Sequence, residues 1–366
     1  MPVAPLHEIS RTRPIGVAVV GANPERGWAM KAHLPALRIL PRFALRAVST
    51  SRPESATAAA VAFGVPAFAK IAPLLARDDV DLVVITVKVP EHAALVEAAL
   101  KAKKHVLCEW PLGLDAGEAR RLALLAAQMG VQGLVGLQAR ASPAVRYVRD
   151  LVREGFVGRL RSTTMIGSGM QWADSFASAN AYIADVRNGA TMLTIPFGHG
   201  VDALCWALGE FRPLAAALAV LQPDARNVET GQVIRKTAAD QIVVAGQLEG
   251  GAIAAIHYRG GSCEGTNFLW EINGDGGTLR VIADTGHLQM ADARLLGARK
   301  GEKMAELAIP DACRAAAHPP SGAPENVAHA YCLIAAGNAP TDFSDALRRH
   351  EMIAAIREVA GHDRGA

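Results

Sequence analysis

The sequence has no long hydrophobic run and no run of basic residues. No stretch of about 18 uncharged apolar residues is present, so we expect no helix that spans a bilayer. Residues 1–13 lack the apolar segment of a secretory signal, and we expect them to form a flexible leader on a cytoplasmic protein. A net charge of +3 is too small to indicate a nucleic-acid surface. We therefore expect neither a membrane nor a nucleic acid as partner.

Cysteine is scarce and widely spaced. The five cysteines are Cys108, Cys205, Cys263, Cys313 and Cys332, and no two of them form a C-x-x-C pair. An odd number at such spacing describes neither a disulfide framework nor a zinc cage, and no cluster of His, Asp and Glu has the spacing of metal ligands. We expect reduced thiols and no bound metal.

The pattern of the chain changes near Arg140. Before it, short apolar runs alternate with helical segments five times, which is typical of a doubly wound parallel sheet. After it, longer runs of alternating residues are separated by Gly-rich turns, as in an open, mainly antiparallel sheet with helices on one face. At 366 residues the chain is long for one core.

The sequence therefore predicts an α/β fold in four parts. These are a leader over 1–13, a dinucleotide-binding Rossmann domain over 14–140, an α+β substrate and oligomerisation domain over 141–344, and a C-terminal helix over 345–366 that packs back on the Rossmann domain. The strands expected in the Rossmann domain are Ile15 to Val20, Ala44 to Ser49, Asp81 to Val87, His105 to Glu109 and Val131 to Leu137. Mobile loops are expected over Gln222 to Thr237 and Lys300 to Pro324.

The segment from Ile15 to Leu37 reads as strand, tight turn and helix. A turn of small residues lets backbone N–H groups approach a pyrophosphate at the positive end of the helix. Only Gly21 fits the pattern G-x-G-x-x-G, because Asn23 replaces the second glycine and Gly27 comes one residue late. We predict cofactor contacts from Gly21, Asn23, Gly27 and Trp28, with an ordinary strand-to-helix turn as the alternative.

The tip of the second strand is the place where a dinucleotide fold meets the adenosine ribose. An acid there would bind the 2′-hydroxyl, but this chain has Ser51 and Arg52, which suit a 2′-phosphate. The expected cofactor is NAD or NADP, with NADP favoured. A solvated loop arginine is the alternative interpretation of Arg52.

Ligands of such folds bind at the carboxyl ends of the strands, so we expect a cleft lined by these ends and by the second domain. The predicted cofactor contacts there are Val87, His92, Glu109, Trp110 and Gln138. The predicted substrate contacts are Trp110, Gln138, Arg140, Trp172 and Tyr182, of which the last two offer stacking faces to a sugar-like ligand or, alternatively, belong to the core.

His199 is the candidate catalytic residue. It lies between two glycines in the segment NGATMLTIPFGHGVD, where a substrate could approach. An imidazole accepts a proton near neutral pH, as oxidation of an alcohol by hydride transfer requires. Asp202 and Asp185 are candidates to orient the ring, and a structural histidine is the alternative.

Taken together, these segments resemble the Gfo/Idh/MocA oxidoreductases. The resemblance runs from Ile15 to Ala360 and rests on the segments HLPAL, DLVVITVKVPEH, HVLCEWPLG, GFVGRLRS, FLWEINGDGGTLRV and DALRRHEMIAAI. It implies an N-terminal Rossmann domain, a C-terminal domain with an open antiparallel sheet that builds dimers or tetramers, NAD or NADP, and sugar or cyclitol substrates.

Two departures from the family pattern affect chemistry. Trp110 replaces a lysine that helps position the substrate, and Ile195 replaces an aspartate four residues before the catalytic histidine. The changed segments look most like the branch containing the fungal galactose-regulon repressor, a regulatory protein similar in fold.

Two hypotheses follow. The first is an NAD(P)-dependent oxidoreductase acting on a sugar-like alcohol, with His199 as base and Lys88 or Lys31 as a substitute charge. The second is a catalytically silent NAD(P)-binding regulator that acts through a protein partner. The histidine in its glycine-flanked setting favours the enzyme.

Overall fold

The computed structural model describes residues 3–316 and 318–361. Residues 1–2 of the expected leader and 362–366 of the expected C-terminal segment lie outside the described residues. The chain divides into two compact units, Met1–Gln138 with Ala315–Arg348 and Ala139–Arg314 with Arg349–Ala366. In the expected scheme residues 315–344 lie in the second domain and the C-terminal helix begins at 345, whereas this division groups 315–348 with the first unit.

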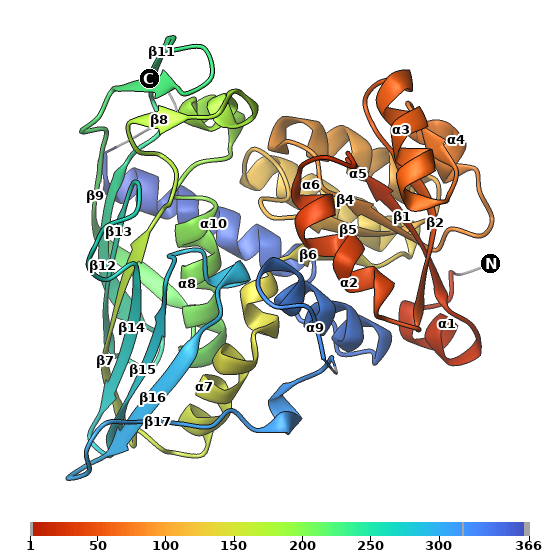
Figure 1. Ribbon diagram of the computed structural model, residues 1–366. Coiled ribbons are helices and arrows are strands. Elements are labelled where there is room, and N and C mark those ends of the chain that lie inside the picture. The colour runs from red at the N-terminus through yellow and green to blue at the C-terminus, as the bar shows by residue number, and fades with distance from the viewer. Residues whose placement is uncertain (1–2, 317, 362–366) are drawn as a thin grey trace. The chain divides into compact units, whose positions relative to one another are not determined.

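The first unit is built on a parallel sheet of six strands in the order β3-β2-β1-β4-β5-β6 (Figure 1). Its strands are β1 (Ile15–Val20), β2 (Phe43–Ser49), β3 (Ala67–Phe68), β4 (Leu82–Ile85), β5 (His105–Glu109) and β6 (Gly133–Gly136). All six residues of β1 are buried, as expected of a central strand covered on both faces. The predicted doubly wound parallel sheet is confirmed.

Helices follow the strands of this sheet in turn. They are α2 (Leu34–Arg38), α3 (Pro53–Phe63), α4 (Ile71–Leu75), α5 (His92–Lys101) and α6 (Ala116–Met129). Local signals set the bounds of α6: the Asp115 carboxylate accepts a hydrogen bond from the Glu118 N–H at 2.9 Å, and Gly130 ends the helix at a φ of 66°. The helix expected at the end of the segment Ile15 to Leu37 begins as a π-type turn, Ala29–His33, which runs into α2.

Two helices absent from the expected scheme complete the first unit. Helix α9 (Ala323–Ala335) packs beside α2, although the two are far apart in the sequence (Figure 1). Helix α1 (Leu6–Thr12) lies within the expected flexible leader. The Ser10 hydroxyl donates to the Ala335 carbonyl at 2.7 Å, and the Leu6 side chain is fully buried. The leader is therefore held as a helix, because it covers apolar surface that α9 brings to the sheet.

The second unit contains a sheet of eight strands in the order β17-β16-β15-β14-β7-β13-β12-β9 (Figure 1). Its strands are β7 (Leu160–Ser168), β9 (Phe211–Ala219), β12 (Gln241–Leu248), β13 (Ile253–Arg259), β14 (Phe268–Gly274), β15 (Gly277–Ala283), β16 (Arg294–Arg299) and β17 (Ala305–Glu306). Only the β7 and β13 pair is parallel in this sheet as described. The expected mainly antiparallel sheet is confirmed.

Helices α7 (Pro143–Arg153) and α8 (Pro196–Leu208) pack on one face of this sheet, and α8 contacts β7. A smaller sheet of β8 (Ser175–Phe176), β10 (Asp224–Asn227) and β11 (Val233–Arg235) lies within the same unit. Two of its strands fall in the segment expected to be a mobile loop, Gln222 to Thr237. The last helix of the described residues is α10 (Phe343–Val359). Its residues from Arg349 onward belong to the second unit.

Across residues 3–316 and 318–361, no helix combines the length and the apolar character needed to cross a membrane.

Candidate functional site

Two glycines keep the turn after β1 free of side-chain bulk. Gly21 has a φ of 95°, and a Cβ atom on it would lie 2.9 Å from the Thr86 hydroxyl oxygen, so no side chain fits. Gly27 also has a positive φ, of 96°. These two positions need glycine because other residues rarely adopt that conformation. The turn therefore stays free of bulk, as backbone binding of a pyrophosphate requires.

Asn23 and Trp28 complete this turn in different ways. The Asn23 side-chain oxygen accepts the Glu25 N–H at 2.9 Å and so shapes the turn itself. The indole N–H of Trp28 is buried and has no hydrogen-bond partner among the described residues. Buried donors are rarely left unpaired, so an acceptor brought by a ligand would improve this site. The turn thus combines two glycines with one buried donor that has no partner among the described residues.

Ser51 and Arg52 are exposed directly after β2. Arg52 is the residue before α3, and its backbone is extended. No carboxylate occurs in the stretch Thr50 to Pro53. The tip of β2 therefore offers a hydroxyl and a guanidinium to a ligand, but no acid to a ribose.

His92 braces two strand-end segments rather than presenting its ring to solvent. Its Nδ1 lies 2.8 Å from the Pro111 carbonyl oxygen and its Nε2 lies 3.0 Å from the Val87 carbonyl oxygen. Burial lowers the pKa of His92, so the neutral ring donates its one N–H to one of these carbonyls. His92 and the Val87 carbonyl, both predicted to contact the cofactor, are thus engaged inside the first unit.

Glu109 and Gln138 were also predicted to contact ligands, and their side chains bond to each other instead. The Gln138 amide nitrogen lies 2.7 and 2.8 Å from the two carboxylate oxygens of Glu109. Both residues are buried. Trp110, which follows directly, is 4% exposed.

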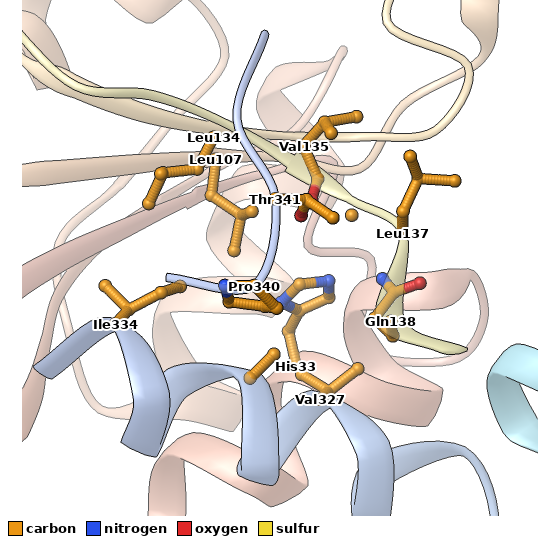
Figure 2. A pocket seen from close by; sticks show the side chains of 12 residues that line it. His33, Leu107, Leu134, Val135, Leu137, Gln138, Val327, Ile334, Pro340 and Thr341 are labelled. Carbon is orange, nitrogen blue, oxygen red and sulfur yellow. The ribbon is translucent and has the colours of Figure 1, made fainter. Parts of the chain in front are cut away.

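Sequence reasoning missed the other members of this cluster. His33 lies 2.8 Å from Glu109 and, through its second nitrogen, 2.8 Å from the Tyr331 hydroxyl. Figure 2 shows the side chains of His33 and Gln138 beside a small, mainly apolar cavity that is also lined by residues of β6 and α9. His33 lies in the quoted segment HLPAL, but nothing near it in the sequence points to Tyr331.

In the second unit, His199 occupies the first turn of α8. Its ring is buried, and Nδ1 has no hydrogen-bond partner among the described residues. Burial, helped by the nearby His287, lowers the pKa of His199 to about 3. The ring is therefore neutral at physiological pH. Gly200 beside it serves packing: a Cβ atom there would lie 2.5 Å from the Tyr258 hydroxyl oxygen.

The acids expected to orient His199 have other partners. Asp202 receives two hydrogen bonds from Arg140, at 2.8 and 2.7 Å, and also lies 3.4 Å from Arg349. Asp185 pairs with Arg187 at 2.7 Å. The Arg140 guanidinium is buried and already forms a bidentate ion pair with Asp202. This pairing argues against the expectation that Arg140 holds a substrate.

The two predicted stacking residues differ in access. Trp172 is 2% exposed, donates its indole N–H to the Ile183 carbonyl at 3.1 Å and stacks on His287. It has the environment of a core residue, which was the alternative interpretation. Tyr182, in the 3-10 segment Ser178–Ala184, is only partly covered and keeps some surface for a ligand.

Neither a reactive Cys108 nor a metal centre is indicated in the described part of the chain. Burial raises the pKa of Cys108 well above its usual value, so this thiol is unreactive. Within 3–316 and 318–361, no group of three or more His, Cys, Asp or Glu is placed to hold a metal ion.

The first unit is an NAD-binding Rossmann fold. Residues 15–137 match the family described as "Oxidoreductase family, NAD-binding Rossmann fold", which is the Gfo/Idh/MocA family, and residues 143–283 match "Gal80p, C-terminal domain". The chain is 31% identical over 280 residues to the dehydrogenase aclE of Aspergillus oryzae, covering 73% of this chain and 76% of that protein. The chain belongs to the Gfo/Idh/MocA oxidoreductase family, in a branch similar to Gal80.

Other relatives include both a regulator and an enzyme. The galactose/lactose metabolism regulatory protein GAL80 of Saccharomyces cerevisiae is 26% identical over 305 residues, which cover 78% of this chain and 70% of that protein. A crystal structure of a Gal80p super-repressor mutant from the same yeast has a TM-score of 0.85 at 24% identity, covering 95% of this chain and 96% of that one. Levoglucosan dehydrogenase in complex with NADH and levoglucosan has a TM-score of 0.80 at 22% identity, covering 95% of this chain and 98% of that one.

Proposed function

We propose that this protein is an NAD(P)-dependent oxidoreductase that transfers a hydride between nicotinamide and a carbon of a sugar-like or cyclitol-like alcohol. The proposal is supported by the glycine turn after β1 and by relatives that are dehydrogenases. The observation that carries it is the neutral, buried imidazole of His199, whose Nδ1 lacks a partner among the described residues. A substrate hydroxyl would supply the hydrogen-bond partner that Nδ1 of His199 lacks.

Oxidation of an alcohol releases a hydride and a proton, and NAD(P)+, when bound, supplies the acceptor for the hydride. His199 has the role of proton acceptor. In the folded protein without a bound substrate, the pKa of His199 is about 3 and the ring is a weak base. Negative charge that develops on the substrate oxygen raises the pKa of an adjacent imidazole, so His199 gains its proton as the alkoxide forms.

We also propose that the protein prefers NADP. Ser51 and Arg52 support this preference, since both are exposed at the tip of β2, and the stretch Thr50 to Pro53 has no acid. The levoglucosan dehydrogenase structures hold NADH, so they lend the preference no support.

The eight-stranded sheet is the proposed surface for a homodimer or homotetramer. Val243 is 46% exposed and alternates with the buried Ile242 and Val244, and Ile253 is 53% exposed beside the buried Ala254. These apolar side chains therefore lie on the sheet face opposite to the helices. Exposed apolar surface of this kind favours burial against a second copy.

A regulatory protein is the second candidate function. Trp110 and Ile195 stand where family enzymes have a lysine and an aspartate, and no described acid bonds to His199. An indole N–H donates a hydrogen bond but does not transfer a proton. In this role the first unit binds NAD(P), and a partner protein distinguishes the cofactor-bound form from the free form. The similarity to GAL80, a regulatory protein, supports a regulatory role.

Cofactor binding and turnover distinguish the two functions. NADH and NADPH are titrated by fluorescence, and a panel of polyols and aldoses is then followed by nicotinamide absorbance. The enzyme is supported by binding with turnover of at least one sugar-like compound, and the regulator by binding without any. Trp110→Lys is the companion variant, because restoring the lysine alters the rate of an enzyme and gives a pure sensor no measurable rate.

A further inference from the structure

A buried, hydrogen-bonded cluster of side chains joins four separate segments of the first unit. His33 ends the π-type turn Ala29–His33, which follows the glycine turn directly, and is 1% exposed. Its Nε2 lies 2.8 Å from a Glu109 oxygen and its Nδ1 lies 2.8 Å from the Tyr331 hydroxyl. Figure 2 shows His33 next to Gln138, whose amide nitrogen donates to both Glu109 oxygens. Short π-type turns often occur at functional sites.

His33 has a hydrogen-bond partner at each ring nitrogen. The Glu109 carboxylate accepts a hydrogen bond from Nε2. Burial raises the pKa of Tyr331 well above its usual value, so its hydroxyl keeps its proton and is hydrogen-bonded to Nδ1. The orientation of the His33 ring is therefore fixed by partners on both sides.

The sequence leaves room for the Glu109 carboxylate at this place. A Cβ atom on Gly136 would lie 2.5 Å from a Glu109 oxygen and 2.8 Å from the Gln138 amide nitrogen. Only glycine allows the carboxylate and the amide to pack against β6 there. The cluster is thus built by four segments, which are the turn before α2, the end of β5, the end of β6 and α9.

We propose that His33 is a positioning residue of the cofactor site. It ties the helix that begins at the glycine turn to Glu109, the residue before Trp110, and so holds two loops of the first unit in one rigid arrangement. The inference rests on the proposed function and on the predicted cofactor contacts of the glycine turn and of Trp110. Preorganised loops raise affinity because less ordering occurs on binding.

A matched pair of variants tests this role through cofactor affinity. In His33→Gln the side-chain amide nitrogen takes the place of Nε2 and still donates to Glu109. In His33→Asn the amide takes the place of Nδ1 and the bond to Glu109 is lost. We expect the Kd for NADPH and NADH to rise about 10-fold or more in His33→Asn, because a buried charged group loses its donor, and about 3-fold at most in His33→Gln.

Gly136→Ala provides a second, independent test, because it displaces the Glu109 carboxylate without touching His33. It too is expected to raise the Kd about 10-fold. Thermal unfolding of each variant identifies those that are folded. A folded His33→Asn or Gly136→Ala protein that binds cofactor within about 2-fold of wild type would overturn the positioning role. Wild-type protein that binds neither NADH nor NADPH would instead refute the proposed function itself, so the two failures are distinguishable.

Discussion

Lowering the pH from 7 to 5 should destabilise this protein through His199. The ring is fully buried, and burial holds its pKa at about 3 in the folded chain. In the unfolded chain the same ring has an ordinary pKa near 6.5. Between these two values the unfolded state binds a proton that the folded state does not, so the free energy of unfolding falls as the pH falls.

The size of the effect follows from the two pKa values. At pH 7 the ring is mainly neutral in both states and contributes little. At pH 5 the unfolded chain gains about 2 kcal/mol by protonating His199, at about 1.4 kcal/mol for each tenfold preference. The loss continues until the pH reaches the folded pKa of about 3.

Urea unfolding of wild-type protein and His199→Gln at pH 7 and pH 5 measures this effect. Other buried histidines with a lowered pKa, such as His92 and His105, are present in both proteins and cancel in the comparison. We expect the wild type to lose about 2 kcal/mol more than the variant between the two pH values. Equal losses, or a His199 ring that titrates near pH 6.5 by NMR, would refute the reasoning.

Three further substitutions test other parts of the account. Arg52→Glu should weaken the binding of NADPH about 10-fold and leave the binding of NADH unchanged or improved, as measured by fluorescence titration. The reason is that an acid suited to the 2′-hydroxyl of a ribose replaces the guanidinium. Val243→Asp should convert the proposed oligomer to monomer in light-scattering chromatography, and an unchanged mass would exclude that sheet face as the interface between copies. Gly200→Ala should lower the free energy of unfolding by about 1 to 3 kcal/mol, because its methyl group overlaps the Tyr258 hydroxyl. Unaltered stability of this variant would show that α8 can move away from the sheet.

The fold could be predicted from the sequence because its signals are local. Buried runs such as Ile15 to Val20 and alternating runs such as Gln241 to Leu248 mark strands by their own periodicity. The missed elements had weaker local signals. Helix α9 follows a segment rich in Pro, Ala and Gly, and α1 is a short helix that is held by contacts with α9 and with Gln132.

Side-chain partners could not be predicted in the same way. The Asp202 that was expected to orient His199 is paired with Arg140, which lies 62 positions away in the chain. The bond between His33 and Tyr331 spans 298 positions. A residue type near a strand end indicates what chemistry is available, but only the folded chain shows which groups are already engaged with each other.

One of the two glycines that flank His199 has a packing role that the sequence did not indicate. Gly200 lets α8 pack closely against Tyr258 and Met165. Gly21 shows the opposite case, since its positive φ and its crowded Cβ position agree with the predicted turn. A glycine can thus mark close packing or a binding turn, and the neighbours decide which.

The most direct test of the account measures cofactor binding and turnover in the same preparations of wild-type protein and His199→Gln. The account predicts that both proteins bind the nicotinamide cofactor with similar affinity, and that the variant turns over a sugar-like substrate about 100-fold or more slowly. Equal turnover by the two proteins, or binding by the wild type with no turnover of any sugar-like compound, would contradict it.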